Sequence, residues 1–109
     1  MKVLFAGSRG ITNYDIAPLV PEGTTLIISG GARGIDTIAE RYADAHGIPK
    51  QIYYPDYDRY GRSAPIRRNE VMVDLADKVI VIWDGVSRGS KFTIDYAKRK
   101  GKEVTVKIV

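Results

Sequence analysis

Three glycine-rich segments contain the residue types of this chain that are best suited to binding an anion. They are Gly7-Ser8-Arg9-Gly10, Gly30-Gly31-Ala32-Arg33-Gly34-Ile35-Asp36 and Asp84-Gly85-Val86-Ser87-Arg88-Gly89-Ser90. Glycine lets the backbone approach a ligand closely, and arginine presents paired N–H donors that suit a phosphate group. Because all three segments also contain an arginine, we interpret them together as a candidate phosphate-binding site.

The candidate ligand-binding residues lie in these segments and on a helix expected to begin at Pro65. They are Gly7, Ser8, Arg9, Gly30, Gly31, Arg33, Asp36, Arg68, Asn69, Asp84, Gly85, Ser87, Gly89 and Ser90. Arg68 stands four residues before Met72, so both would share one helix face, with the arginine facing a cleft. The candidates for a catalytic role are Arg68, Asp36 and Glu70, and no group of residues predicts a metal site.

Several of these residues have an alternative, purely structural role. Asp36 could bind a ribose hydroxyl or act as a catalytic carboxylate, or it could be an acid favoured in the first turn of a helix. Ser87 could be a helix N-cap, and Asp84 could contact a ribose or a metal or cap the following turn. Tyr57 and Tyr60 could stack on a base or pack a long loop.

The elements that must position these residues are indicated by hydrophobic periodicity. Five β-prone runs are predicted as strands: Lys2–Ala6, Thr25–Ser29, Gln51–Tyr54, Val79–Trp83 and Val104–Val109. Their nearly continuous apolar character is typical of strands that are buried on both faces.

Helical patterns connect these runs. One helix is expected from Ile35 to Ala45, a second from Pro65, and a third that ends before Gly101. The second helix is expected to bury four residues: Val71, Met72, Leu75 and Ala76. The first connection, residues 12–19, is expected to be weakly helical because prolines truncate it.

Alternating strands and helices predict one α/β domain over residues 1–109. We expect a Rossmann-like three-layer sandwich with a five-stranded parallel sheet in the order 3-2-1-4-5. Ligands of such sheets bind beyond the carboxyl ends of the strands. The three glycine-rich segments are therefore expected to meet at one sheet edge.

Composition excludes several other kinds of site. The 109 residues include no cysteine and one histidine, which excludes disulfide scaffolds, thiolate metal sites and histidine-pair mechanisms. The chain has neither a P-loop motif nor a Gly-x-Gly-x-x-Gly motif after its first strand. No apolar run approaches the ~20 residues that span a bilayer, and we expect a cytoplasmic protein with no membrane partner. A net charge of +4 favours an anionic partner.

Five ordered motifs give the chain a family resemblance. They are Ala6-Gly7-Ser8-Arg9, Ser29-Gly30-Gly31-Ala32-Arg33-Gly34-Ile35-Asp36, Tyr60-Gly61-Arg62, Arg68-Asn69-Glu70-Val71-Met72 and Asp84-Gly85-Val86-Ser87-Arg88-Gly89-Ser90. They resemble a stand-alone domain of the SLOG superfamily, in its YspA/YpsA-related (YAcAr) branch. That superfamily also contains DNA-processing protein A and the LOG-type phosphoribohydrolases. The resemblance implies a Rossmann-like domain that binds a nucleotide-derived ligand across these loops, and it implies a homodimer.

The LOG-type enzymes allow a more detailed comparison. Their helix motif Arg-Lys-x-x-Met is similar to the segment that begins at Arg68, with Asn69 in place of the lysine. Their phosphate loop Pro-Gly-Gly-x-Gly-Thr-x-x-Glu corresponds to residues 85–93, which would therefore grip a phosphate. The glutamate of that motif falls on Thr93, and a threonine cannot act as a carboxylate base.

We therefore expect a sensor or ligand-binding module for a nucleotide-derived ligand, with no cofactor required. One alternative is a phosphoribohydrolase that cleaves a nucleoside monophosphate to base and ribose 5-phosphate. Another alternative is single-stranded nucleic-acid binding, which draws on the pI of 9.4, the arginines and the tyrosines.

Overall fold

One sheet of five parallel strands, in the order β3-β2-β1-β4-β5, organises the fold. The strands are β1 (Lys2–Gly7), β2 (Leu26–Ser29), β3 (Lys50–Ile52), β4 (Lys78–Trp83) and β5 (Glu103–Ile108). This computed structural model describes residues 1–109, and it confirms the α/β class and the expected strand order. The order reverses between β1 and β4, which is the position where open α/β sheets bind ligands.

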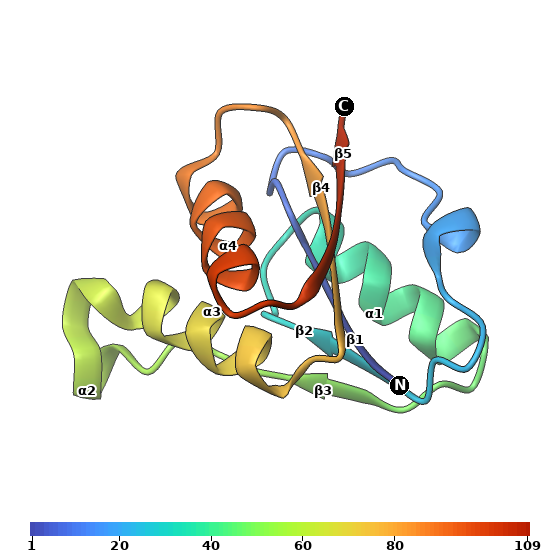
Figure 1. Cartoon of the computed structure of the whole chain (residues 1–109), viewed down its shortest axis with the longest axis horizontal. Coiled ribbons are helices and arrows are strands. Elements are labelled where there is room, and N and C mark those ends of the chain that lie inside the picture. The colour runs from blue at the N-terminus through green and yellow to red at the C-terminus, as the bar shows by residue number, and fades with distance from the viewer.

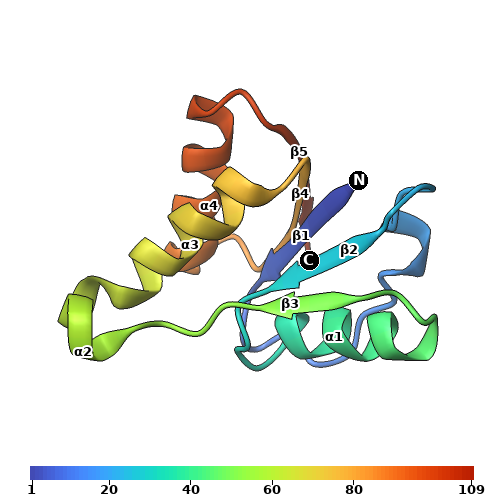
Figure 2. The ribbon, with the colours of Figure 1, turned by 90° about the horizontal axis from the view of Figure 1, so that it is seen from below.

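Helices cover both faces of the sheet. Helix α1 (Ile35–Ala45) lies on one face, and α3 (Ala64–Leu75) and α4 (Arg88–Arg99) lie together on the other (Figure 1 and Figure 2). The remaining elements are a short helix and two 3₁₀ turns: α2 (Tyr57–Tyr60), η1 (Ala17–Leu19) and η2 (Gly61–Ser63). No helix in the chain has the length and apolar character needed to span a membrane.

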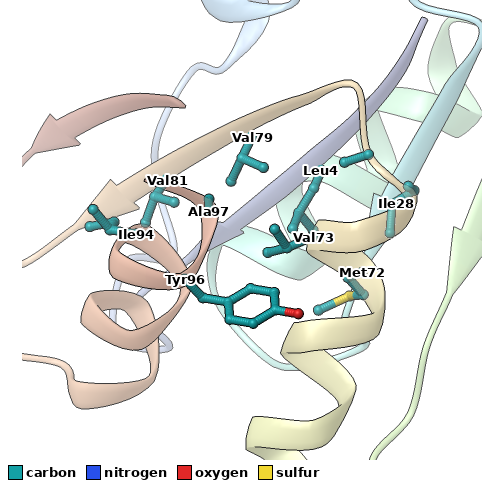
Figure 3. Packing of buried hydrophobic residues seen from close by; sticks show 10 residues of the cluster. Leu4, Ile28, Met72, Val73, Val79, Val81, Ile94, Tyr96 and Ala97 are labelled. Carbon is teal, nitrogen blue, oxygen red and sulfur yellow. The ribbon is translucent and has the colours of Figure 1, made fainter. Parts of the chain in front are cut away.

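Alternate residues of the central strands pack against the two helical layers. Val3 and Phe5 of β1 belong to a buried cluster on the α1 side, together with Ile80 of β4. Leu4 and Val79 belong to the cluster beneath α3 and α4 (Figure 3). Both central strands are therefore buried on both faces. Their carboxyl ends fix the positions at which the following loops begin.

The connection between β1 and β2 contains only one short 3₁₀ turn, which confirms the expected weak helix. No α-helix of this connection covers the sheet. The Ile16 side chain is buried there instead, with Ile11 and Leu19 partly buried beside it.

Helix α3 presents a different face to the sheet from the one expected. Met72 and Ala76 are buried, but Val71 and Leu75 are 46% and 38% exposed, and Val73 is buried in their place. The expected burial of Val71 and Leu75 is therefore wrong. At about 100° per residue, Met72, Val73 and Ala76 span an arc of about 100° around the helix axis. Val71 and Leu75 both lie outside one edge of this arc. The apolar residues of α3 cover a wider arc than the face that packs against the sheet. Composition alone therefore does not show which of these residues are buried.

Gly34 joins the start of α1 to the loop after β1. Its φ is +78°, and a Cβ built on it would lie 2.4 Å from the carbonyl oxygen of Ser8. Gly23 has a φ of +79° but open space around it. We predict that Gly23→Ala lowers the unfolding free energy by about 1–2 kcal/mol, which is the cost of the left-handed backbone alone. Gly34→Ala should lower it by a further ~1–3 kcal/mol, because the neighbouring backbone must move.

Urea unfolding of the two glycine variants measures this difference. Equal losses of stability would show that the close approach of Gly34 to Ser8 does not constrain the fold.

Candidate functional site

A cavity of about 320 Å³ opens beyond the carboxyl end of β1, between α3 and the starts of α1 and α4. Most of the predicted ligand residues line it: Gly7, Ser8, Arg9, Asp36, Arg68, Asn69, Ser87, Gly89 and Ser90. The structure thus brings parts of all three glycine-rich segments, and the predicted pair on α3, to one place.

Helix α4 begins at this cavity, and no side chain caps its amino terminus. The Ser87 hydroxyl donates instead to Asp84 Oδ2 at 2.9 Å, and its oxygen lies 3.2 Å from Ser8 Oγ, close enough to accept from the Ser8 hydroxyl. Gly89 and Ser90, in the first turn of α4, line the cavity. The N–H groups of a first helical turn have no acceptor within the helix, and the helix dipole makes this end partly positive. This end of α4 is therefore suited to an anion.

Asp84 lies outside the cavity and shapes the turn that precedes α4. Its Oδ1 accepts from the backbone N–H groups of Val86 at 2.9 Å and Ser87 at 2.8 Å. These hydrogen bonds lower the pKa of Asp84 to about 2, so this carboxylate is ionised at neutral pH. The indole N–H of Trp83 holds the same turn by donating to the Ser87 carbonyl at 3.0 Å. Of the three roles left open for Asp84, these hydrogen bonds correspond to the capping of the turn.

Asp36, in the first turn of α1, is a buried carboxyl group on the cavity wall and is 7% exposed. Its Oδ2 accepts from the Ala32 N–H at 3.1 Å. Burial raises the pKa of Asp36 to about 6, although the Ala32 N–H and the positive charges of Arg68 and Arg9 act in the opposite direction. A carboxyl group with this pKa can accept a hydroxyl hydrogen when ionised and can carry a proton near neutral pH.

Arg68 reaches from α3 to the carboxyl ends of β2 and β3. Its Nη1 donates to the carbonyl oxygens of Gly30 and Tyr53, and its Nε donates to Asn69 Oδ1 at 2.9 Å. Its Nη2 has no acceptor within the chain. Burial lowers the pKa of Arg68 and the negative charge of Asp36 raises it, but a guanidinium group stays protonated at neutral pH. Arg68 therefore offers a ligand two charged N–H donors.

Gly30 makes the room that Arg68 and Asp36 need. A Cβ at Gly30 would lie 2.8 Å from Arg68 Nη1 and 3.0 Å from Asp36 Oδ2. A larger residue at this position would displace both side chains, so Gly30 acts from beneath the cavity wall.

The other predicted ligand residues also lie outside the cavity wall. They are Gly30, Gly31, Arg33, Asp84 and Gly85. Arg33 is exposed and makes no hydrogen bond or ion pair within the chain. Gly31 lies under the Tyr54 ring, since a Cβ there would be 2.5 Å from Tyr54 Cε1. The catalytic candidate Glu70 is also outside this cavity and pairs with Arg67 at 3.4 Å.

Some cavity residues were not proposed as ligand contacts from the sequence. They are Ala6, Gly10, Ala32, Pro65, Met72 and Thr93. Thr93 is 2% exposed, and its hydroxyl donates to the Gly89 carbonyl at 3.1 Å. Helical spacing could have identified two of these residues from the sequence, because residues three or four positions apart share a helix face. Thr93 follows Gly89 at this spacing, and Pro65 precedes Arg68 at it.

Comparison with known proteins identifies the family. The family model YAcAr, described as the YspA, cpYpsA-related SLOG family, matches residues 1–60. The chain belongs to the YAcAr family. The YAcAr match includes the loops after β1 and β2 and the Asp36 carboxyl group, whereas α3 and α4 lie beyond it. Membership of a SLOG family indicates nucleotide-related binding or processing.

This YAcAr protein is also similar to the Gene 61 protein of Mycobacterium phage D29. The two are 29% identical over 82 residues, which cover 70% of this chain and 66% of the phage protein. The match therefore spans slightly less than two thirds of the phage protein. No solved structure matches the chain.

The opposite pKa shifts of Asp36 and Asp84 predict opposite effects of amide substitution. The pKa of Asp36 is raised from 3.8 to about 6, so the protein gains stability from this group as pH falls from 6 towards 4. Asp36→Asn removes the cost of ionising a buried carboxyl group. It should stabilise the protein at pH 8 by on the order of 3 kcal/mol, with the gain disappearing between pH 6 and 4.

Asp84→Asn is the control variant. The pKa of Asp84 is lowered, so its ionised form stabilises the fold at neutral pH and this contribution is lost as pH falls from 4 towards 2. Thermal unfolding of both variants from pH 2 to pH 8 measures the two effects. A destabilised Asp36→Asn protein at pH 8 would contradict the described environment of Asp36.

Proposed function

We propose that this YAcAr protein binds a phosphate-bearing nucleotide or nucleotide-derived ligand in the cavity beyond β1. The observation that carries the proposal is that one cavity contains both an uncapped helix terminus and the free guanidinium donors of Arg68. Both features favour an anion with several acceptor oxygens. The cavity volume of about 320 Å³ also falls within the range of small-molecule sites.

The chemistry of the lining residues suggests how such a ligand is oriented. The phosphate group lies against the first turn of α4, where Gly89 and Ser90 border the cavity. Asp36 and Asn69 supply a carboxylate and an amide, which suit the hydroxyl groups of a ribose. The family's link to nucleotide-related binding or processing agrees with a ligand of this class. Binding in this manner requires no cofactor.

A second candidate function is hydrolysis of a nucleoside monophosphate to base and ribose 5-phosphate. It is favoured by the buried Asp36 carboxyl group, since a general base is most effective when its pKa is near the working pH. Thr93 stands where the LOG-type motif has glutamate, so Asp36 would have to activate the attacking water. Release of adenine from AMP by the wild-type protein, lost in Asp36→Asn, would support hydrolysis. AMP that is bound but remains intact would exclude it for this nucleotide.

Two exposed arginines provide a matched test of the binding site. Arg9 lines the cavity and makes no hydrogen bond within the chain, whereas Arg33 is equally free but lies outside the cavity. We predict that Arg9→Ala weakens AMP binding by at least about tenfold, because a hydrogen bond to a charged group contributes ~1.5–3 kcal/mol. Arg33→Ala should leave the affinity unchanged. Isothermal titration calorimetry at physiological ionic strength measures both affinities.

The two arginine substitutions change the net charge equally, so a general attraction of AMP to a basic protein would weaken equally in both. Equal weakening, or no weakening in either variant, would contradict the proposed position of the phosphate.

A further inference from the structure

A second cavity lies beside the first, and Arg68 borders both. Its volume is about 410 Å³, and it is bordered by the connection from β3 to α2, by α3 and by α4. The two cavities therefore meet at one side chain, whose Nη2 has no acceptor within the chain.

Aromatic rings and charged side chains together form most of the wall of the second cavity. Four tyrosines line it: Tyr53, Tyr54, Tyr60 and Tyr96. Hydrogen bonds orient two of the rings, since the Tyr53 hydroxyl donates to Gln51 Oε1 and the Tyr96 hydroxyl donates to Asp74 Oδ1, each at 3.0 Å. Tyr54 is 68% exposed, so much of its surface is available to a ligand. Tyr60 is 38% exposed, and the guanidinium carbons of Arg59 and Arg67 lie 5.1 and 6.0 Å from the centre of its ring. Tyrosine rings of this kind stack on flat aromatic groups.

The carboxylates in the same wall already have partners within the chain. Glu70 pairs with Arg67 at 3.4 Å, and Asp74 accepts from the Tyr96 hydroxyl. Asp56 accepts from the Arg59 backbone N–H at 3.1 Å. The wall therefore combines partnered acids with the exposed ring of Tyr54, which favours a flat uncharged ring over a cation.

We propose that the second cavity binds the second ring system of a two-part nucleotide ligand, while the phosphate-bearing first nucleoside occupies the first cavity. The inference rests on the proposed function and specifies its ligand class as two flat ring systems joined through ribose and phosphate. The linking phosphates lie between the first turn of α4 and the free guanidinium donors of Arg68, both of which border the first cavity. Charged N–H donors such as those of Arg68 Nη2 are well suited to a phosphate.

Two ligands that differ by one base test the proposal. ADP-ribose and diadenosine diphosphate share an adenosine, a diphosphate and a second ribose, but only the latter has a second adenine. Stacking of one base on an aromatic side chain corresponds to about a fivefold or larger change in affinity. We therefore expect diadenosine diphosphate to bind the wild-type protein at least about fivefold more tightly than ADP-ribose in calorimetric titrations.

A matched pair of variants on α3 tests whether the second cavity causes the tighter binding of diadenosine diphosphate. Val71 borders the second cavity and is 46% exposed, whereas Leu75 is 38% exposed and borders neither cavity. Val71→Asp should abolish the preference for diadenosine diphosphate and leave AMP affinity unchanged, and Leu75→Asp should preserve both. Tyr60→Ala should reduce the preference, and Tyr60→Phe, which keeps the ring, should retain it.

The outcomes separate this inference from the proposed function. Equal binding of the two ligands, or a preference that survives in Val71→Asp, would overturn the second cavity as a ring site while AMP binding still supported the first. Failure of AMP and both larger ligands to bind would overturn the proposed function, and this inference with it.

Discussion

The contact between Arg68 and the Gly30 carbonyl is the constraint on which both cavities depend. It links α3 to the carboxyl end of β2, and a second bond to the Tyr53 carbonyl extends the link to the end of β3. The guanidinium group thereby forms a wall that the two cavities share. Glycine at position 30 makes room for this arrangement, because a Cβ there would lie 2.8 Å from Arg68 Nη1 and 3.0 Å from Asp36 Oδ2.

Two aspartates near the same sheet edge show how local structure gives chemically identical groups different pKa values. Asp84 accepts backbone N–H bonds from the turn before α4, so its pKa falls to about 2 and it serves as a fixed anion that orders the turn. Asp36 is buried beside the cavity, and its pKa rises to about 6. One group organises the end of α4 that is suited to a phosphate, while the other is left able to exchange a proton with a ligand. Their different roles follow from hydrogen bonding in one case and from burial in the other.

The sequence predicted the sheet more completely than it predicted the site. Nearly continuous apolar runs identify central strands such as β4, and the right-handed connections of a parallel sheet restrict their order. Loop composition does not determine which way each side chain points, so Arg9 lines the cavity and Arg33 does not. On α3, the apolar stripe is wider than the buried face, and Val71 therefore remains exposed. The place of Thr93 in the cavity follows from the approach of α4 to α3, which depends on packing between distant segments.

The central claim, that a nucleotide phosphate lies against the first turn of α4, is tested most directly by NMR. The backbone amide signals of an isotope-labelled sample would be followed while AMP is added. If the phosphate lies there, the largest saturable changes occur at Gly89 and Ser90, which line the cavity, with no change at Gly47 or Gly101, which lie outside it. Saturable changes confined to residues outside the cavity, with Gly89 and Ser90 unaffected, would contradict the claim.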